Sequence, residues 1–466
     1  MNSLFRSWFF PLVPQVLGLI AFGLLIVGGL AADTGNPAFA KVLSNTNLAN
    51  LIVWSYWWPL IILGAIVFGR VWCMICPMEL VTSTASRIGL KRRPPKWVRS
   101  GWGITVFYVM ILFVGIHTLA AHRIPFRMAL YMLTLLCVAV IVGLVFSRNT
   151  FCASVCPVGH LLGLYARLAP FGWGVKDKSV CQGCKDKSCI SPRTAYRFQG
   201  HSCAVSLVPN KIKNNDACLL CGQCLKACDQ NNPGLDERPN PGLFKKPFAQ
   251  DLFSLQGLSG AQASFCLVVS GFVIYEILTE WGVTKDLLLY TPNLIQLQLG
   301  WSNVWAAGLI QSMLLFVILP LFLWLIPYGL FRVQSRAMSV KEYLCTFGIA
   351  FIPIMAATHA LKSLLKMTSR IPYWRNALTD PVGINTARDI LEKKLHLAQL
   401  PTWSDVLLTL AALDLVLVGI FLSALTVRRL SVRLAGTTRA QSIIFYLIPT
   451  LYGGVFLVTL VAWRVF

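Results

Sequence analysis

The chain has 466 residues, a formal net charge of +23 and a mean hydropathy of +0.65, with 56% hydrophobic and only 13% charged residues. This balance excludes an ordinary soluble domain and predicts a protein that lies largely within a membrane. The sequence contains no Cys-x-x-Cys-His haem motif, no phosphate-binding Walker loop and no Gly-x-Gly-x-x-Gly motif. Nothing in it therefore indicates nucleotide chemistry.

Nine apolar segments are long enough to cross about 30 Å of hydrocarbon as helices. They comprise residues 9–31, 51–69, 102–120, 127–147, 262–282, 302–330, 344–361, 404–426 and 441–463. The first lacks a basic flank and a small-residue cleavage site, so we expect a retained span rather than a signal peptide. The predicted fold is an all-α polytopic membrane protein with a small α+β insert. Its expected regions are 1–147 (four helices), 148–261 (the insert) and 262–466 (five helices).

The distribution of basic residues predicts the orientation of these spans. The link after the second span holds Arg70, Arg87, Lys91, Arg92, Arg93, Lys96 and Arg99. The segments 32–50 and 283–301, in contrast, hold only Lys41 and Lys285. We therefore expect the cytoplasmic membrane of a prokaryote, with the N-terminus and the insert in the cytoplasm and the C-terminus outside. The positive charge also suits anionic lipid. No nucleic-acid partner is expected, because no basic module with interleaved aromatic residues is present.

Within the insert, residues 181–228 contain eight cysteines in two groups. Cys218, Cys221, Cys224 and Cys228 form Cys-x-x-Cys-x-x-Cys-x-x-x-Cys, the spacing of a bacterial ferredoxin loop. Cys181, Cys184 and Cys189 form a second close set, and Cys203 follows fourteen positions later. A cluster of four irons needs thiolates that converge from different directions, which a tight loop and one distant cysteine provide. We therefore predict two [4Fe–4S] clusters on these eight residues.

Four further cysteines form an internal repeat. Residues 68–77 run Phe-Gly-Arg-Val-Trp-Cys-Met-Ile-Cys-Pro, and residues 146–157 run Phe-Ser-Arg-Asn-Thr-Phe-Cys-Ala-Ser-Val-Cys-Pro. Each closes an apolar span, so the repeat predicts a helical bundle with a pseudo-twofold axis. The thiols of Cys73, Cys76, Cys152 and Cys156 could meet at that axis. Three roles stay open for them: a third iron–sulfur cluster, a redox-active dithiol, or structural thiols at helix ends.

Paired Cys-Pro motifs followed by a double ferredoxin insert resemble the NapH, NosR, MauN and CcoG group of membrane ferredoxin-type proteins, over about residues 50–235. The resemblance implies a membrane-bound protein that relays electrons between a cytoplasmic or quinol donor and a membrane or periplasmic acceptor. The alternative is a maturation or metal-reducing accessory factor of the CcoG type. Whether the chain is itself an enzyme, or the electron-transfer component of an oxidoreductase system, is open.

In two-cluster ferredoxins the fourth cysteine of each motif binds the other cluster. The resemblance thus implies one cluster on Cys181, Cys184, Cys189 and Cys228, and another on Cys218, Cys221, Cys224 and Cys203. Lysines surround both motifs. They are expected either to dock an acidic redox partner such as ferredoxin or flavodoxin, or to solvate the surface.

Ionisable residues inside the C-terminal spans are the remaining candidates, because burying them in a membrane is costly. His359 in the seventh span and Asp414 in the eighth suggest a quinone site that handles protons. The competing interpretation of a lone membrane histidine is a hydrogen bond between helices. A b-type haem on a histidine pair such as His117 and His359 is the least favoured alternative. The segment from Ile384 to Leu397 is expected to form an amphipathic helix.

Overall fold

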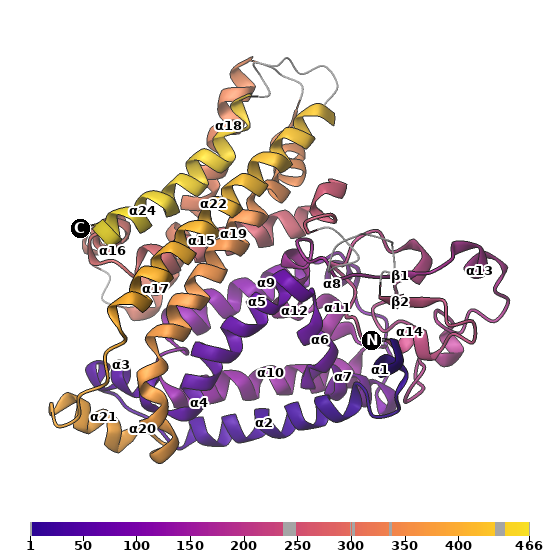
Figure 1. Ribbon diagram of the computed structural model, residues 1–466, viewed down its shortest axis with the longest axis horizontal. Helices are drawn as coiled ribbons and strands as arrows, with labels where there is room; N and C mark the ends of the chain where they lie inside the picture. Colours follow the sequence, from indigo (N-terminus) through magenta and orange to yellow (C-terminus); the bar gives the residue numbers. More distant parts are fainter. Residues whose placement is uncertain are drawn as a thin grey trace. The chain divides into compact units, whose positions relative to one another are not determined.

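The computed structural model describes residues 2–235, 248–298, 300, 303–334, 338–433 and 443–465 (Figure 1). The chain divides into two compact units. Unit 1 comprises residues 1–27, 61–107 and 129–254, and unit 2 comprises residues 28–60, 108–128 and 255–466. Several long helices run from one unit into the other along the chain.

Unit 1 contains many short helices and the sheet found in the described part of the chain. Its helices are α1 (Asn2–Arg6), α6 (Val71–Ile75), α7 (Pro77–Ile88), α8 (Lys96–Arg99), α11 (Thr150–Ser154), α12 (Pro157–Tyr165), α13 (Lys178–Gly183) and α14 (Gln223–Lys226), with the 3-10 turns η3 (Pro192–Thr194), η4 (Pro209–Lys211) and η5 (Leu252–Ser254). It also holds most of α2 (Leu12–Leu30), α5 (Trp58–Phe68), α9 (Trp102–Met110) and α10 (Pro125–Val145). Strands β1 (Trp173–Val175) and β2 (Pro233–Leu235) pair antiparallel, with Trp173 opposite Leu235.

The N-terminal segment is anchored on the cysteine-rich insert. Phe5 packs edge-on against Trp173, with ring centroids 5.2 Å apart, in a buried cluster with Phe10, Leu220 and Leu225. Lys226 Nζ donates hydrogen bonds to the carbonyls of Ser7 at 2.8 Å and Phe10 at 2.5 Å. Gly222 has a φ of +71°, and a Cβ there would lie 2.7 Å from the Phe5 ring, so this turn requires glycine.

Unit 2 is a helical bundle in which α19 (Val340–Ser369) packs against both α22 (Thr402–Arg433) and α15 (Gly260–Leu278) (Figure 1). Its other helices are α3 (Pro37–Thr46), α4 (Leu48–Leu51), α16 (Gly282–Gln298), α17 (Val304–Met313), α18 (Leu319–Gln334), α20 (Trp374–Thr379), α21 (Ile384–Leu391) and α24 (Gly453–Val465), with the 3-10 turn η7 (Ile371–Tyr373). Four π-helical segments interrupt its apolar helices: η1 (Ile52–Trp57), η2 (Ile111–Thr118), η6 (Leu314–Ile318) and η8 (Ile448–Tyr452). Ser259 and Gln262 form a capping box that begins α15. In the core, Trp324 stacks on Phe351 with centroids 3.9 Å apart.

Seven helices of the described residues are long and apolar enough to cross a membrane. They are Leu12–Leu30, Leu48–Phe68, Pro125–Val145, Gly260–Leu278, Val304–Val333, Val340–Thr379 and Thr402–Arg433. Two further expected spans form shorter apolar helices, Trp102–Thr118 and Ile448–Arg464. Seven of the nine expected spans thus coincide with helices long enough to cross a membrane, as in an all-α membrane protein, and in the described residues the other two lie on shorter apolar helices.

α16 occupies most of the segment 283–301. One local expectation differs from the structure. The helix expected from Ile384 to Leu397 ends at Leu391, because Lys393 adopts a φ of +58° and the chain turns there.

Candidate iron–sulfur sites

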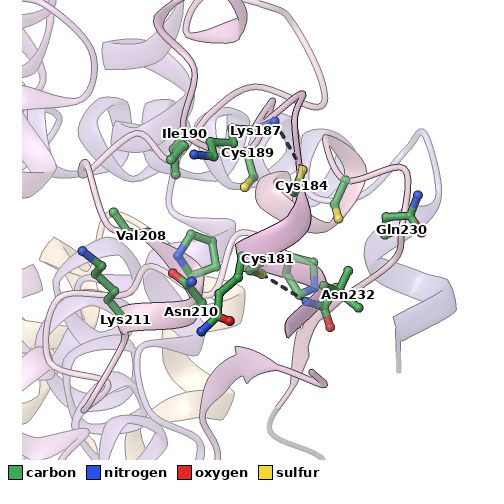
Figure 2. A pocket seen from close by; sticks show the side chains of 15 residues that line it. Cys181, Cys184, Lys187, Cys189, Ile190, Val208, Asn210, Lys211, Gln230 and Asn232 are labelled. Carbon is green, nitrogen blue, oxygen red and sulfur yellow. Dashed lines mark hydrogen bonds between the residues drawn. The ribbon is translucent and has the colours of Figure 1, made fainter. Parts of the chain in front are cut away.

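Cys181, Cys184, Cys189 and Cys228 line a cavity of about 330 Å³ in the insert (Figure 2). Cys181 lies in α13, which Asp177 caps at its N-terminus, and Cys184 follows the last turn of that helix. Two hydrogen bonds reach their sulfurs: Asn232 Nδ2 donates to Cys181 Sγ at 3.1 Å, and the Lys187 backbone N–H donates to Cys184 Sγ at 3.4 Å. Figure 2 shows both bonds beside the cavity. Three cysteines of one motif and one of the other therefore share one cavity.

The charges of these thiols affect one another. Burial, followed by the charges of the neighbouring Cys228, Cys181 and Cys184 in that order, raises the pKa of Cys189 to about 11. Burial also raises the pKa of Cys181, which Cys228 and Cys184 reinforce. Thiols that disfavour each other's ionisation in this way need a cation to become thiolates together.

Cys203, Cys218, Cys221 and Cys224 line a second, narrower cavity next to Trp173. Trp173 Nε1 donates to Cys224 Sγ at 3.0 Å, and the Leu207 backbone N–H donates to Cys203 Sγ at 3.3 Å. Burial raises the pKa of Cys218 to about 12 and that of Cys224 well above its usual range. The free space is only about 20 Å³, so a bound cubane requires the side chains to move outward.

The two cavities divide the eight cysteines in the crossed manner that the resemblance implies. Cys228 lies beyond α14 and joins the first cavity, whereas Cys224 within α14 joins the second. Cys203, at the end of the segment that follows Cys189, lines the second cavity. Its backbone N–H nevertheless donates to the carbonyl of Cys189, a first-cavity residue, at 3.0 Å.

The two Cys-Pro motifs bring a third set of thiols together. Cys73 lies in α6 and Cys152 in α11, while Cys76 and Cys156 are the N-cap residues of α7 and α12, each followed by proline at the first helical position. Burial raises the pKa of Cys152 well above its usual range, and Cys156, Glu79, Cys76 and Cys73 add to this. Two segments some eighty residues apart in the sequence thus place four thiols within electrostatic reach of one another.

The sulfurs of this third set also accept hydrogen bonds. The Gly159 backbone N–H donates to Cys156 Sγ at 3.3 Å, and Arg70 Nε donates to Cys73 Sγ at 3.4 Å. Burial raises the pKa of Cys156 to about 11, while the Gly159 N–H and then Arg70 oppose that rise. A helix N-terminus and a guanidinium both favour negative charge on these sulfurs.

The arginine of each repeat connects the third set to the second cavity. Arg70 has only 4% of its surface exposed and donates through Nη1 to the carbonyl of Asp216 at 3.0 Å, two residues before Cys218. Arg148 donates through Nη1 to the carbonyl of Cys203 at 3.4 Å. Asp216 also forms an ion pair with Arg167 at 2.7 Å. Because Arg70 is buried, its guanidinium does not extend from the protein into the polar surface of the membrane.

The chemistry of these sites suits iron–sulfur clusters better than single ions. Among the residues that the structure describes, no three His, Cys, Asp or Glu side chains converge on one metal ion. A cubane spreads its cysteine ligands over four irons, so they stand farther apart than the ligands of one ion. Each set has four cysteines and at least two N–H groups directed at their sulfurs, and such hydrogen bonds tune bound clusters.

The two C-terminal candidates differ in burial. Asp414 is exposed on α22, whereas His359 is buried in α19 beside the ring of Phe272, with centroids 5.9 Å apart. The carboxylate at the level of His359 is Glu276, which forms an ion pair with Lys362 at 3.5 Å. Lys362 was not predicted from the sequence, although its spacing of three residues from His359 places both near one helix face.

A polar cavity of about 330 Å³ adjoins Glu276 in unit 2. Its lining includes His117, Tyr275 and Gln311, and His117 Nε2 lies 3.3 Å from Gln311 Oε1. Two of the π-helical segments, η2 and η6, contribute His117 and Phe316 to its walls. Such segments often occur at functional sites.

The helices and the thiol sets together define an α-helical membrane protein with a ferredoxin-type region. In agreement, residues 50–105 and 128–176 match the family model of a 4Fe-4S binding domain. The first matched segment contains Cys73 and Cys76 and the second contains Cys152 and Cys156, while the insert cysteines from Cys181 onward lie outside both. No curated protein and no solved structure matches the chain. The match therefore supports a 4Fe-4S ferredoxin-type region in this part of the chain.

Proposed function

We propose that the protein is a membrane-bound relay that holds three [4Fe–4S] clusters and passes electrons between a cytoplasmic or quinol donor and a membrane or periplasmic acceptor. The observation that carries this proposal is the Cys-Pro repeat. Its two segments match a 4Fe-4S binding domain, and the charges of Cys156, Cys76 and Cys73 all act on Cys152. Of the three roles left open by the sequence, this favours a cluster over a dithiol or structural thiols.

The spacing of the thiol sets supports a relay. Bound [4Fe–4S] clusters exchange single electrons at potentials set by charge, exposure and hydrogen bonds to sulfur. Arg70 joins the third set to the chain next to the second cavity: its Nε donates to Cys73 Sγ at 3.4 Å, and its Nη1 donates at 3.0 Å to the carbonyl of Asp216, two residues before Cys218. The backbone joins the second cavity to the first through Cys189 and Cys203. The three sets thus follow one another without a gap in the chain of contacts.

The first cavity is the proposed docking end. Lys187 and Lys211 line it, and Lys185 lies on its second face. Cationic side chains around a partly exposed site attract an acidic redox partner such as ferredoxin or flavodoxin. We place this end in the cytoplasm, with the C-terminus outside the cytoplasmic membrane, because the basic links alternate on one side.

A quinone is proposed as a second small-molecule partner. We take the polar cavity beside Glu276, in place of His359 and Asp414, as the candidate quinone site, because aromatic side chains and hydrogen-bonding groups line it. A cavity of about 330 Å³ falls within the usual range for ligand sites.

Iron analysis of the anaerobically purified full chain tests the relay. Three clusters correspond to about twelve irons per chain. Changing both Cys152 and Cys156 to serine should remove about four of them, whereas Cys266→Ser, a buried thiol of α15, should remove none. About eight irons in the unmodified protein would refute the third cluster. Reduction by a quinol or by a low-potential ferredoxin then identifies the donor. An acceptor used only in assembly would favour the accessory role.

A further inference from the structure

Glu79 is a buried carboxylate near the Cys-Pro thiols that is not one of the proposed cluster ligands. It lies in the first turn of α7 with 6% of its surface exposed. Gln15 Nε2 donates to Oε2 at 2.7 Å, and Asn149 Nδ2 donates to Oε1 at 2.7 Å. Both oxygens therefore act as acceptors from neutral amides, as an ionised carboxylate does. Gln15 belongs to α2 and Asn149 precedes α11, so two other parts of unit 1 fix this side chain.

The carboxylate lies beside the Cys-Pro thiols, because the Glu79 backbone N–H donates to the carbonyl of Cys76 at 3.2 Å. It also lies near the second cavity. Gln15, which holds Oε2, donates in addition to the carbonyl of Met74 at 3.0 Å, and Met74 packs against the same buried cluster as Cys218 and Cys224. One charge thus lies near both sets of thiols.

The repeat shows that this charge is not required by the helix start. Glu79 follows Cys76 by three residues, and Gly159 occupies the same place after Cys156. A Cβ at Gly159 would lie 2.7 Å from Arg70 Nη2, so the guanidinium fills the space there. Two Cys-Pro helix starts of the same design therefore carry opposite charges, a carboxylate at one and an arginine at the other.

We propose that Glu79 is a positioning residue that lowers the reduction potential of the clusters bound at the Cys-Pro thiols and at the second cavity. The inference rests on the proposed function. A fixed negative charge opposes the addition of an electron nearby, and it does so more strongly in a dry interior than in water. If these two clusters have lower reduction potentials than the others in the relay, an electron does not accumulate on them.

Potentiometric titration of the purified protein, followed by electron paramagnetic resonance, tests this role. Glu79→Gln should shift the midpoints of two clusters to more positive values and leave the third, at Cys181, as an internal reference. Adding Asn149→Asp to Glu79→Gln returns a negative charge to the same hydrogen bond and should reverse the shift. Glu342→Gln, which removes an exposed carboxylate at the start of α19, is the matched control.

Each outcome decides the matter. Unshifted midpoints in a Glu79→Gln protein that retains all three clusters would overturn the role of Glu79 and leave the relay intact. Failure of the unmodified protein to hold three clusters would instead refute the relay. If Glu79→Gln alone loses clusters, the comparison uses Glu79→Gln with Asn149→Asp against Glu79→Gln with Asn149→Ser. The charged pair must then have the lower midpoints, and equal midpoints contradict the proposal.

Discussion

Replacing Gly159 with alanine should disturb the Cys-Pro site through Arg70. The added Cβ would lie 2.7 Å from Arg70 Nη2 and 3.6 Å from Cys156 Sγ. Because Arg70 is 4% exposed, its guanidinium has no water to move into, and it must give up its 3.0 Å bond to the Asp216 carbonyl. Overpacking a buried site costs about 1–3 kcal/mol. Losing a hydrogen bond from a charged donor costs about 1.5–3 kcal/mol more. We expect a total loss of about 3–5 kcal/mol.

Denaturant unfolding of the detergent-purified protein measures this loss, and iron content should fall by one cluster. The control is Gly23→Ala in α2, where a Cβ has no atom within 4 Å and should leave both readouts unchanged. If the effect passes through Arg70, then Gly159→Ala and Arg70→Lys will be less than additive in combination. Wild-type stability and full iron in Gly159→Ala would show that the guanidinium moves freely, and the reasoning would fail.

Three further results are expected. Cys228→Ser should remove about four irons from the first cavity and leave the resonance signal of the Cys203 set, and loss of both signals would contradict the crossed arrangement. Asp216→Asn removes the carboxylate 2.7 Å from the buried Arg167 and should lower the free energy of unfolding by about 3 kcal/mol. A decrease of less than about 1 kcal/mol would contradict this prediction. Burial, followed by Arg70, lowers the pKa of His160 to about 4, so the folded state needs it neutral. The stability that neutral His160 contributes is present above about pH 6.5 and is lost as the pH falls towards 4, by up to about 3 kcal/mol. In His160→Gln, the melting temperature should therefore depend less on pH over that range.

The sequence was sufficient where the chemistry is local. Three cysteines within a few residues must form one loop, so the spacing around Cys218 indicated ligands without knowledge of the fold. Apolar length located the membrane helices for the same reason. The repeat likewise predicted a relation between Cys73 and Cys152, and the charge of Cys73 does act on Cys152.

Features that depend on helix rotation were not accessible. Asp414 and His359 both lie in apolar helices, yet α22 turns Asp414 outward while α19 turns His359 inward, and a hydropathy profile does not encode this difference. The contrast between Glu79 and Gly159 is visible in the sequence as an unequal repeat. Its meaning depends on the space around Arg70, which only the packed structure supplies.

Phe5 and Phe10 pack against Trp173, which is made much later during synthesis of the chain. These phenylalanines leave the ribosome about 160 residues before the indole that covers them, which at 5–20 residues per second is a delay of roughly 8–30 s. During that time the two rings can pack only on each other, as they do in the folded protein with centroids 5.2 Å apart, or on the membrane surface. Lys226, whose hydrogen bonds hold the segment, is made later still. The segment around Phe5 and Phe10 therefore reaches its place only after Trp173 and the second cavity have formed.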